Sequence, residues 1–194
     1  MLVVRDYFDH KFNFNTYVAL GSFDGLHLGH LKLISKTIEL SKKNKAKSMI
    51  LTFRNHPLSI INKELMPKLI MSNDYKIKLF EELGIDIVNL VEFNEEIMHI
   101  TPEDYIKNII TANNVKGLIV GFNHRFGYKN SGDIELLKKL SVKYKFELYV
   151  IDAVKVNEEV VSSTKIREYI SEGEIVKADR MLTRPYKLSG TVIH

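Results

Sequence analysis

The sequence predicts an α/β fold in which a mostly parallel sheet is covered by helices on both faces. Short apolar runs typical of buried strands alternate along the chain with segments whose apolar residues recur at helical spacing. Hydrophobic residues make up 45% of the 194 residues and charged residues 27%, a balance typical of globular proteins. Strands that alternate with helices favour parallel pairing, because each helix returns the chain across the sheet. The length suits one domain with a sizeable core.

The first half of the chain predicts three strands and two helices. The strands are expected at 17–21, 47–53 and 85–91. Apolar residues recur at helical spacing from Leu28 to about Ser41, which predicts the first helix. The second is expected at 74–83, ending before Gly84, a residue typical of helix C-termini. The stretch 54–70 has no clear periodicity, so it is expected either as a functional loop or as a meandering connection with a short helix.

The second half continues the alternation. Thr101 can cap a helix, Pro102 suits its first position, and the two carboxylates that follow complement the helix N-terminus. This helix is expected to run to about Ala112. The remaining elements are expected as a strand at 117–121, a helix at 133–144, a strand at 146–151 and a strand-like run at 159–161. The complete pattern is that of a parallel sheet buried on both faces.

Composition excludes several classes of site. The chain has no cysteine, which excludes disulfides, thiolate metal sites and cysteine catalysis. No apolar run approaches the roughly 20 residues of a membrane-spanning helix. The N-terminus carries Asp6 and no long apolar core, unlike a signal peptide. We therefore expect a cytoplasmic protein with no membrane partner. The net charge of +4 suits nucleotides as well as nucleic acids, so it selects neither.

The segment from Gly21 to His30, GSFDGLHLGH, follows the first predicted strand and enters the first predicted helix. Ligands of doubly wound sheets bind at this kind of junction. Its three glycines permit sharp turns and the close approach of a phosphate, and the helix N-terminus offers free N–H groups. His27 and His30 lie three residues apart, so they can share one face and donate hydrogen bonds to phosphoryl oxygens. The segment predicts a nucleotide-binding site.

Other interpretations of the histidine pair stay open. The two can be surface histidines, or half of a zinc site, although no third ligand stands nearby. The pair also matches the H-x-G-H element of class I aminoacyl-tRNA ligases, but no Lys-Met-Ser-Lys-Ser-like loop follows. The segment is neither a Walker loop nor a G-x-G-x-x-G pattern.

A second segment, VSSTKIR from Val161 to Arg167, begins a predicted helix. Its hydroxyl residues are natural helix caps. Lys165 and Arg167 place two cations beside a helix N-terminus, where the helix dipole favours anions. One interpretation is a capped helix with solvated cations. The favoured one is that a ligand phosphate supplies the missing negative charge, with Arg167 binding it in a bidentate way.

The two segments together resemble motifs of the bacterial FAD synthetases, the bifunctional riboflavin kinase/FMN adenylyltransferase family, which read G-x-F-D-G-x-H-x-G-H and S-S-T-x-I-R. The resemblance covers nearly the whole chain, since segments 52–57, 93–106 and 120–127 also resemble family segments. Two positions depart from the family pattern. His124 stands where phenylalanine is more usual, which bears on contacts near the flavin, and Tyr75 interrupts a segment that commonly reads L-T-x-x-E-K.

The resemblance implies a Rossmann-like nucleotidyltransferase fold and the reaction ATP + FMN → FAD + pyrophosphate. It implies Mg²⁺ held mainly by the ATP phosphates, with no metal site built from side chains. The residues expected to be catalytic are His27, His30 and Arg167. The residues expected to bind the nucleotide are Gly21, Ser22, Phe23, Asp24, Gly29, Asn123, Ser162, Ser163 and Thr164. The residues expected on the flavin side are His56, Pro57 and Phe126.

The resemblance also implies a domain organisation. Residues 1–183 are expected to form the adenylyltransferase module, and 184–194 are expected to enter a riboflavin kinase barrel. We therefore expect the chain to hold one module of a longer protein, with the kinase domain as its partner and no kinase activity of its own. No nucleic-acid partner is expected.

Three alternatives stay open. A sister nucleotidyltransferase acting on nicotinamide mononucleotide, phosphopantetheine or glycerol phosphate would share the H-x-G-H element, although segments 52–57 and 120–127 favour the flavin family. A nucleic-acid-binding module would show aromatic residues interleaved with Lys and Arg on one face, which the sequence lacks. A nucleotide- or flavin-binding protein without turnover would carry the same motifs.

Overall fold

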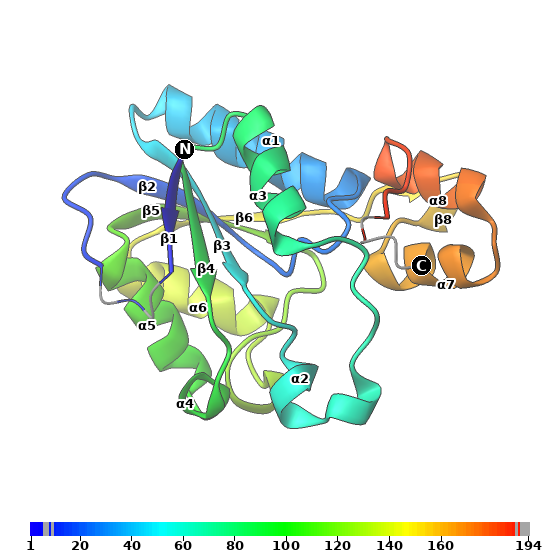
Figure 1. Cartoon of the computed structure of the whole chain (residues 1–194). Coiled ribbons are helices and arrows are strands. Elements are labelled where there is room, and N and C mark those ends of the chain that lie inside the picture. The colour runs from blue at the N-terminus through cyan, green and yellow to red at the C-terminus, as the bar shows by residue number, and fades with distance from the viewer. Residues whose placement is uncertain (6–7, 9, 189, 191–194) are drawn as a thin grey trace.

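A six-stranded sheet, all of whose strands run parallel, forms the centre of the chain (Figure 1). The computed structural model describes residues 1–5, 8, 10–188 and 190. The sheet has the order β1-β4-β3-β2-β5-β6. Its strands are β1 (Leu2–Val4), β2 (Thr16–Leu20), β3 (Lys47–Phe53), β4 (Ile87–Val91), β5 (Val115–Gly121) and β6 (Glu147–Ile151). The predicted α/β class is confirmed.

The order of the strands contains a switch point. From β2 the chain adds β3 and then β4 on one side, and it later returns to add β5 and β6 on the other side. The connections leaving β2 and β5 therefore diverge, which opens a crevice beyond the carboxyl ends of these two neighbours. The motif from Gly21 to His30 directly follows β2, and the segment from Phe122 directly follows β5. Topology thus brings the first motif to the place where such sheets bind ligands.

Helices cover both faces of the sheet, as predicted. On one face lie α1 (Leu28–Lys43) and α3 (Asn73–Glu82), and on the other α5 (Pro102–Ala112) and α6 (Ile134–Tyr144) (Figure 1). Short turns of helix join these elements. They are α2 (Leu58–Ile61), η1 (Lys63–Leu65), α4 (Glu95–Met98) and η2 (Tyr128–Asn130).

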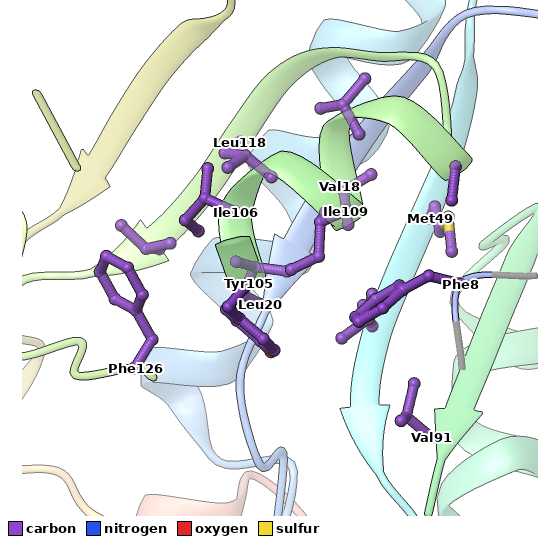
Figure 2. Close-up of a cluster of buried hydrophobic side chains, with 14 of the residues drawn as sticks. Phe8, Val18, Leu20, Met49, Val91, Tyr105, Ile106, Ile109, Leu118 and Phe126 are labelled. Carbon is purple, nitrogen blue, oxygen red and sulfur yellow. The ribbon is translucent and has the colours of Figure 1, made fainter. Parts of the chain in front are cut away.

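Alternation along the strands divides the core into two clusters. In β2, Val18 and Leu20 pack with α5 in one cluster, while Tyr17 and Ala19 pack with α1 in the other. Figure 2 shows the first cluster, in which Tyr105, Ile106 and Ile109 of α5 face the strand residues. Burial on both faces explains why the central strands read as continuous apolar runs in the sequence.

A small unit of C-terminal elements lies at the carboxyl end of the sheet. The hairpin β7 (Lys155–Val156) and β8 (Glu159–Val160) is followed by α7 (Ser163–Ser171) and α8 (Ile175–Leu182). These elements have their own buried cluster, which includes Ile166, Tyr169 and Met181. Ile70, which belongs to the connection between β3 and α3, joins this cluster and ties the unit to the sheet.

The five predicted strands of the sheet and the four predicted long helices are confirmed, with bounds that differ by a few residues. The edge strand β1, the helix α8 and the short helices α4 and η2 were not predicted, because none is long enough to show clear periodicity. The short helices α2 and η1 lie in 54–70, where a connection with a short helix was one of the two expectations. Of the run at 159–161, Glu159 and Val160 form one arm of the separate hairpin. Residues 184–188 form neither helix nor strand. The predicted entrance to a second domain at 184–194 stays a prediction, and 189 and 191–194 lie outside the described residues.

No helix in the described part of the chain combines the length and apolar character that a membrane crossing requires.

Candidate active site

A cavity of about 350 Å³ opens beyond the carboxyl ends of β2, β5 and β6. Its walls come from both motifs and from the segment after β5. The lining includes Gly21, Ser22, His27, Gly29, His30, Asn123, His124, Asp152, Ser162, Ser163 and Thr164. Most of the residues expected to bind a nucleotide thus line one cavity, although about 130 residues of sequence separate the two motifs.

The loop that enters α1 has an unusual backbone. Phe23, Gly25 and Leu26 have φ angles of 50°, 84° and 43°. Only glycine adopts such angles readily, so packing must hold the other two residues in place. The Phe23 side chain is fully buried and contacts Phe80, edge on, with ring centroids 5.6 Å apart. Phe23 therefore anchors the loop to the core, and its ring does not line the cavity.

The two histidines of the first motif stack on each other. Their ring centroids are 3.6 Å apart and the ring planes differ by 14°. The Nδ1 atom of His27, the N-cap of α1, accepts a hydrogen bond of 3.3 Å from the backbone N–H of His30. A side chain on Gly29 would approach the His27 ring to 3.2 Å, so the glycine leaves room for this stack. The accepting Nδ1 leaves the proton of neutral His27 on Nε2.

Both rings are neutral near pH 7. Burial, and to a lesser degree the charge of Arg184, lowers the pKa of His27 to about 4. Burial also lowers the pKa of His30 well below its ordinary value, with the charges of His27, Lys76 and Arg184 acting in the same direction. The Nδ1 of His30 is buried without a hydrogen-bond partner among the described residues. Each neutral ring carries one N–H group, which can donate a hydrogen bond to an anion.

The second motif closes the cavity from the opposite side. Ser162 caps α7 by accepting a hydrogen bond of 3.1 Å from the N–H of Lys165, as predicted. Ser163 donates a hydrogen bond of 2.8 Å to the carbonyl oxygen of Asp24, which joins the two motifs directly. Thr164 is exposed and lines the cavity. The first turn of α7 thus presents hydroxyl groups to the same space as the histidines.

The cations of the second motif are paired with carboxylates of the protein. Arg167 contacts Asp24 at 2.7 Å and donates a second hydrogen bond of 2.9 Å to the carbonyl oxygen of Lys68. Asp24 also accepts hydrogen bonds from the N–H of Ile70. Lys165 lies 3.1 Å from Glu168. The sequence indicated a ligand phosphate as the partner of these cations, and the carboxylates of Asp24 and Glu168 were not predicted. Arg167 lines neither this cavity nor the smaller one described next.

A smaller cavity of about 20 Å³ adjoins the first. It is lined by Ser22, Asp24, Phe53, Arg54, Asn55, His56, Pro57, Leu69, Met71, Asn73 and Lys76. Ser22 lines both cavities, so they meet at this residue. His56 and Pro57, expected on the flavin side, lie here. Burial, followed by the charge of Arg167, lowers the pKa of His56.

The segment after β5 divides between cavity and core. Asn123 is exposed and lines the larger cavity. Burial lowers the pKa of His124 to about 4, and its ring stacks on Phe126 with centroids 5.7 Å apart. Phe126 is buried in the core, where it stacks on Tyr105, and it lines neither of the two cavities. The expected flavin-side residue Phe126 therefore supports the wall of the site from behind.

Two cations at this site were missed by the sequence analysis. Lys76 of α3 is buried beside Ser22. Arg184 donates hydrogen bonds to the carbonyl oxygens of Gly25 and Leu26, and so holds the loop before His27. Both lie outside the two motifs. Lys76 stands at the lysine of the segment that commonly reads L-T-x-x-E-K in the family, but it was given no role there.

A third cavity, of about 480 Å³, is lined by Arg5, Arg54, Asn73, Asp74, Ile77 and Leu90. It is larger than the other two, but it contains no residue of either motif. Among the described residues no three His, Asp or Glu side chains gather in a way that would hold a metal ion.

An all-parallel sheet with a cavity at its switch point is the architecture of nucleotidyltransferase-like α/β proteins, and this chain has it. A crystal structure described as a macrolide-efflux protein from Streptococcus pneumoniae has the same fold. The TM-score is 0.84, at 23% identity, over 96% of this chain and 61% of that one. That likeness concerns the fold alone.

Sequence comparison identifies the family. The profile of the FAD synthetase family matches residues 9–165, so the chain belongs to this family. Relatives include the bifunctional riboflavin kinase/FMN adenylyltransferases of Buchnera aphidicola subsp. Schizaphis graminum, 39% identical over 186 residues, and of Listeria monocytogenes, 33% identical over 183 residues. These matches cover 95% and 93% of this chain, but 60% and 57% of the relatives. The chain thus spans about 60% of the length of the relatives that it matches.

Proposed function

We propose that the chain catalyses the transfer of the adenylyl group of ATP to FMN, which gives FAD and pyrophosphate. The observation that carries this proposal is the pair of cavities that meet at Ser22, with two stacked neutral histidines in the larger one. Family membership supports the choice of substrates. ATP is assigned to the larger cavity and the flavin to the smaller one.

The reaction needs no general base. The FMN phosphate is ionised near pH 7, and one of its oxygens attacks the α-phosphorus of ATP. A new P–O bond forms, the bond from the α-phosphorus to the bridging oxygen breaks, and its electron pair leaves with pyrophosphate. Catalysis then consists of in-line positioning and of neutralising the charge on the transferring group. Neutral histidines stabilise this charge by donating N–H hydrogen bonds to the phosphoryl oxygens.

His27 and His30 are assigned to the α-phosphoryl group, since both line the larger cavity from the N-terminus of α1. Backbone N–H groups of this helix end add to their effect. Ser162, Ser163 and Thr164 are assigned to the β- and γ-phosphates from the N-terminus of α7. Arg167 lines neither cavity and is paired with Asp24, so its assigned contact with the phosphates requires the side chain to move on ATP binding.

Mg²⁺ is assigned to the substrate. It would enter bound to the phosphates of ATP and neutralise part of their charge. Asp152 is the only carboxylate among the residues that line the larger cavity in the described part of the chain, which suits an ion whose other ligands are substrate oxygens and water. The C-terminal region present in the relatives is assigned riboflavin kinase activity, so this chain is not expected to phosphorylate riboflavin.

The test is to incubate the chain with FMN, ATP and Mg²⁺ and to follow FAD and pyrophosphate by chromatography. We expect FAD from the native chain and a rate about 10²–10³-fold lower from His30→Ala, since one preorganised donor is lost. His99→Ala is the matched control, because His99 is exposed and lines neither cavity. Absence of FAD with the native chain, at any flavin concentration, would refute the proposal.

A further inference from the structure

Lys76 is a buried cation without an ion-pair partner in the described part of the chain. Its residue surface is 6% exposed, and burial lowers the pKa of its ammonium group. No carboxylate oxygen of the described residues lies within 4.0 Å of its Nζ atom. Asp24, whose charge opposes the pKa shift, is already paired with Arg167. A buried charge without a partner is costly, so its position requires a reason.

The ammonium group lies where the two cavities meet. Lys76 lines the smaller cavity, and its Nζ lies 3.4 Å from the carbonyl oxygen of Ser22, the residue that lines both. Its charge also reaches His30 in the larger cavity, where it contributes to the lowered pKa of that ring. Under the proposed function, this junction is where the phosphate of the acceptor must meet the α-phosphorus of ATP.

A role in holding the loop does not account for Lys76. The carbonyl oxygen of Ser22 accepts a second hydrogen bond, of 3.0 Å, from the hydroxyl group of Thr52. This oxygen therefore keeps a partner without the lysine. The ammonium group has three donors, and one long hydrogen bond occupies at most one of them. The remaining donors are available to an anion.

The other cations near the smaller cavity are engaged. Arg167 pairs with Asp24, and Arg54 is exposed and lies 3.6 Å from Glu92. Lys76 is thus the buried cation of this cavity that lacks a carboxylate among the described residues.

We infer that Lys76 binds the phosphate group of the acceptor and aims its attacking oxygen at the α-phosphorus of ATP. This inference rests on the proposed function for the identity of the acceptor, FMN. The geometry itself points only to an anionic group at the junction. Binding here pairs the buried ammonium with a dianion in a water-poor site, where such charge-assisted hydrogen bonds are strong.

The test compares two flavins that differ by one phosphate. Affinities of FMN and riboflavin are measured by flavin fluorescence for the native chain, Lys76→Met and Lys78→Met. Lys78 is the matched control, because it lies two residues away on α3 with a side chain 69% exposed. We expect Lys76→Met to weaken FMN binding about 10–100-fold, while riboflavin binding changes by less than about twofold. Lys78→Met is expected to change neither.

Equal weakening of both flavins by Lys76→Met would overturn the inference, because it would indicate a structural role. Unchanged FMN affinity would also overturn it. Methionine removes a buried charge at similar length, so the variant is expected to fold. A second measurement needs no variant, since the native chain must bind FMN at least about tenfold more tightly than riboflavin.

The inference and the proposed function fail in different ways. A native chain that prefers FMN through Lys76 but makes no FAD would refute the reaction and keep the phosphate site. If the native chain makes FAD, and Lys76→Met changes neither the FMN affinity nor the KM for FMN, the inference is refuted and the reaction stands.

Discussion

The two cavities share Ser22 but are built in different ways. The larger one, about 350 Å³, is walled by the ends of sheet strands and by the first turns of α1 and α7. The smaller one, about 20 Å³, is walled largely by residues on either side of the connection 58–69. That connection exposes apolar side chains, with Ile61 54% and Leu65 66% exposed. The larger cavity, the nucleotide side, is therefore formed by the sheet and its helices. The smaller cavity, the acceptor side, is formed largely by a surface connection.

This difference indicates how the two substrates bind. A nucleotide can enter a cavity that already exists. The three fused rings of a flavin do not fit into about 20 Å³, so the smaller cavity must widen, and exposed apolar side chains of 58–69 are available to cover the ring. We expect the nucleotide side to resist change and the acceptor side to adapt. Substitutions on the two sides are therefore expected to differ in their cost to stability.

The largest effect is expected at Gly127, which fixes the wall after β5. Its φ angle is 71°, and an added Cβ would lie 2.6 Å from the Cα atom of Pro102. Gly127→Ala is therefore expected to lower the free energy of unfolding by about 2–4 kcal/mol, measured by urea denaturation. Gly173→Ala is the control, since Gly173 has a φ angle of 78° but open space around it. A loss at Gly127 no larger than that at Gly173 would show that this wall can adapt.

The Asp24–Arg167 pair, which lies between the motifs, comes next. The Asp24 side chain is 7% exposed and Arg167 22% exposed. Asp24→Asn leaves a half-buried guanidinium without its carboxylate, so we expect a loss of about 2–3 kcal/mol in the free energy of unfolding. Glu92→Gln breaks an exposed pair with Arg54 and is expected to cost less than about 0.5 kcal/mol. Similar losses in the free energy of unfolding of both variants would show that the buried pair stabilises the fold no more than the exposed one.

Acid is expected to destabilise the nucleotide side. The pKa of His27 and of His124 is lowered from 6.5 to about 4. The unfolded chain therefore binds more protons than the folded chain between pH 6.5 and 4, and stability falls as pH falls through this window. Each histidine is expected to account for a loss of roughly 1–2 kcal/mol between pH 7 and pH 5.

Denaturation at these two pH values, with His27→Gln and His124→Gln, measures this contribution. Each variant is expected to lose less stability on acidification than the native chain. His10→Gln, at an exposed position, is the control and is expected to follow the native chain. A native chain equally stable at pH 7 and pH 5 would contradict the neutral, buried state of these rings.

The smallest effect on stability is expected in the connection 58–69. The double variant Ile61→Ser, Leu65→Ser changes two exposed side chains, so the free energy of unfolding is expected to change by less than about 0.5 kcal/mol. FMN affinity is nevertheless expected to fall severalfold, with ATP affinity unchanged, because the apolar cover of the flavin is reduced. A loss of ATP affinity instead would assign this connection to the nucleotide side.

Features set by local sequence were predictable, and features set by distant packing were not. The glycine turn, the histidine pair and the caps at Thr101 and Ser162 follow from residues a few positions apart, and the structure has them. The burial of Lys76 depends on how α3 packs over Ser22, 54 residues away in the sequence. The resemblance places Lys76 at the lysine of the segment that commonly reads L-T-x-x-E-K, but the sequence does not show that this lysine is buried.

Packing between distant segments also explains why the surroundings of three expected site residues were not predicted. Asp24 and Arg167 are 143 residues apart, so their ion pair was not visible in the spacing of either motif. Phe126 was expected on the flavin side because its segment resembles the family there, but its ring packs on Tyr105 in the core. A family motif thus locates a segment at the site, while the direction of each side chain depends on the fold.

In the proposed reaction, the acceptor phosphate meets the α-phosphorus of ATP directly at the junction of the cavities. ATP made chiral at the α-phosphorus by sulfur substitution tests this step, with FMN, Mg²⁺ and the native chain. A single in-line displacement predicts one adenylylated flavin per pyrophosphate, with the configuration at phosphorus inverted. Retention of configuration, or pyrophosphate released without an adenylylated flavin, would contradict the account.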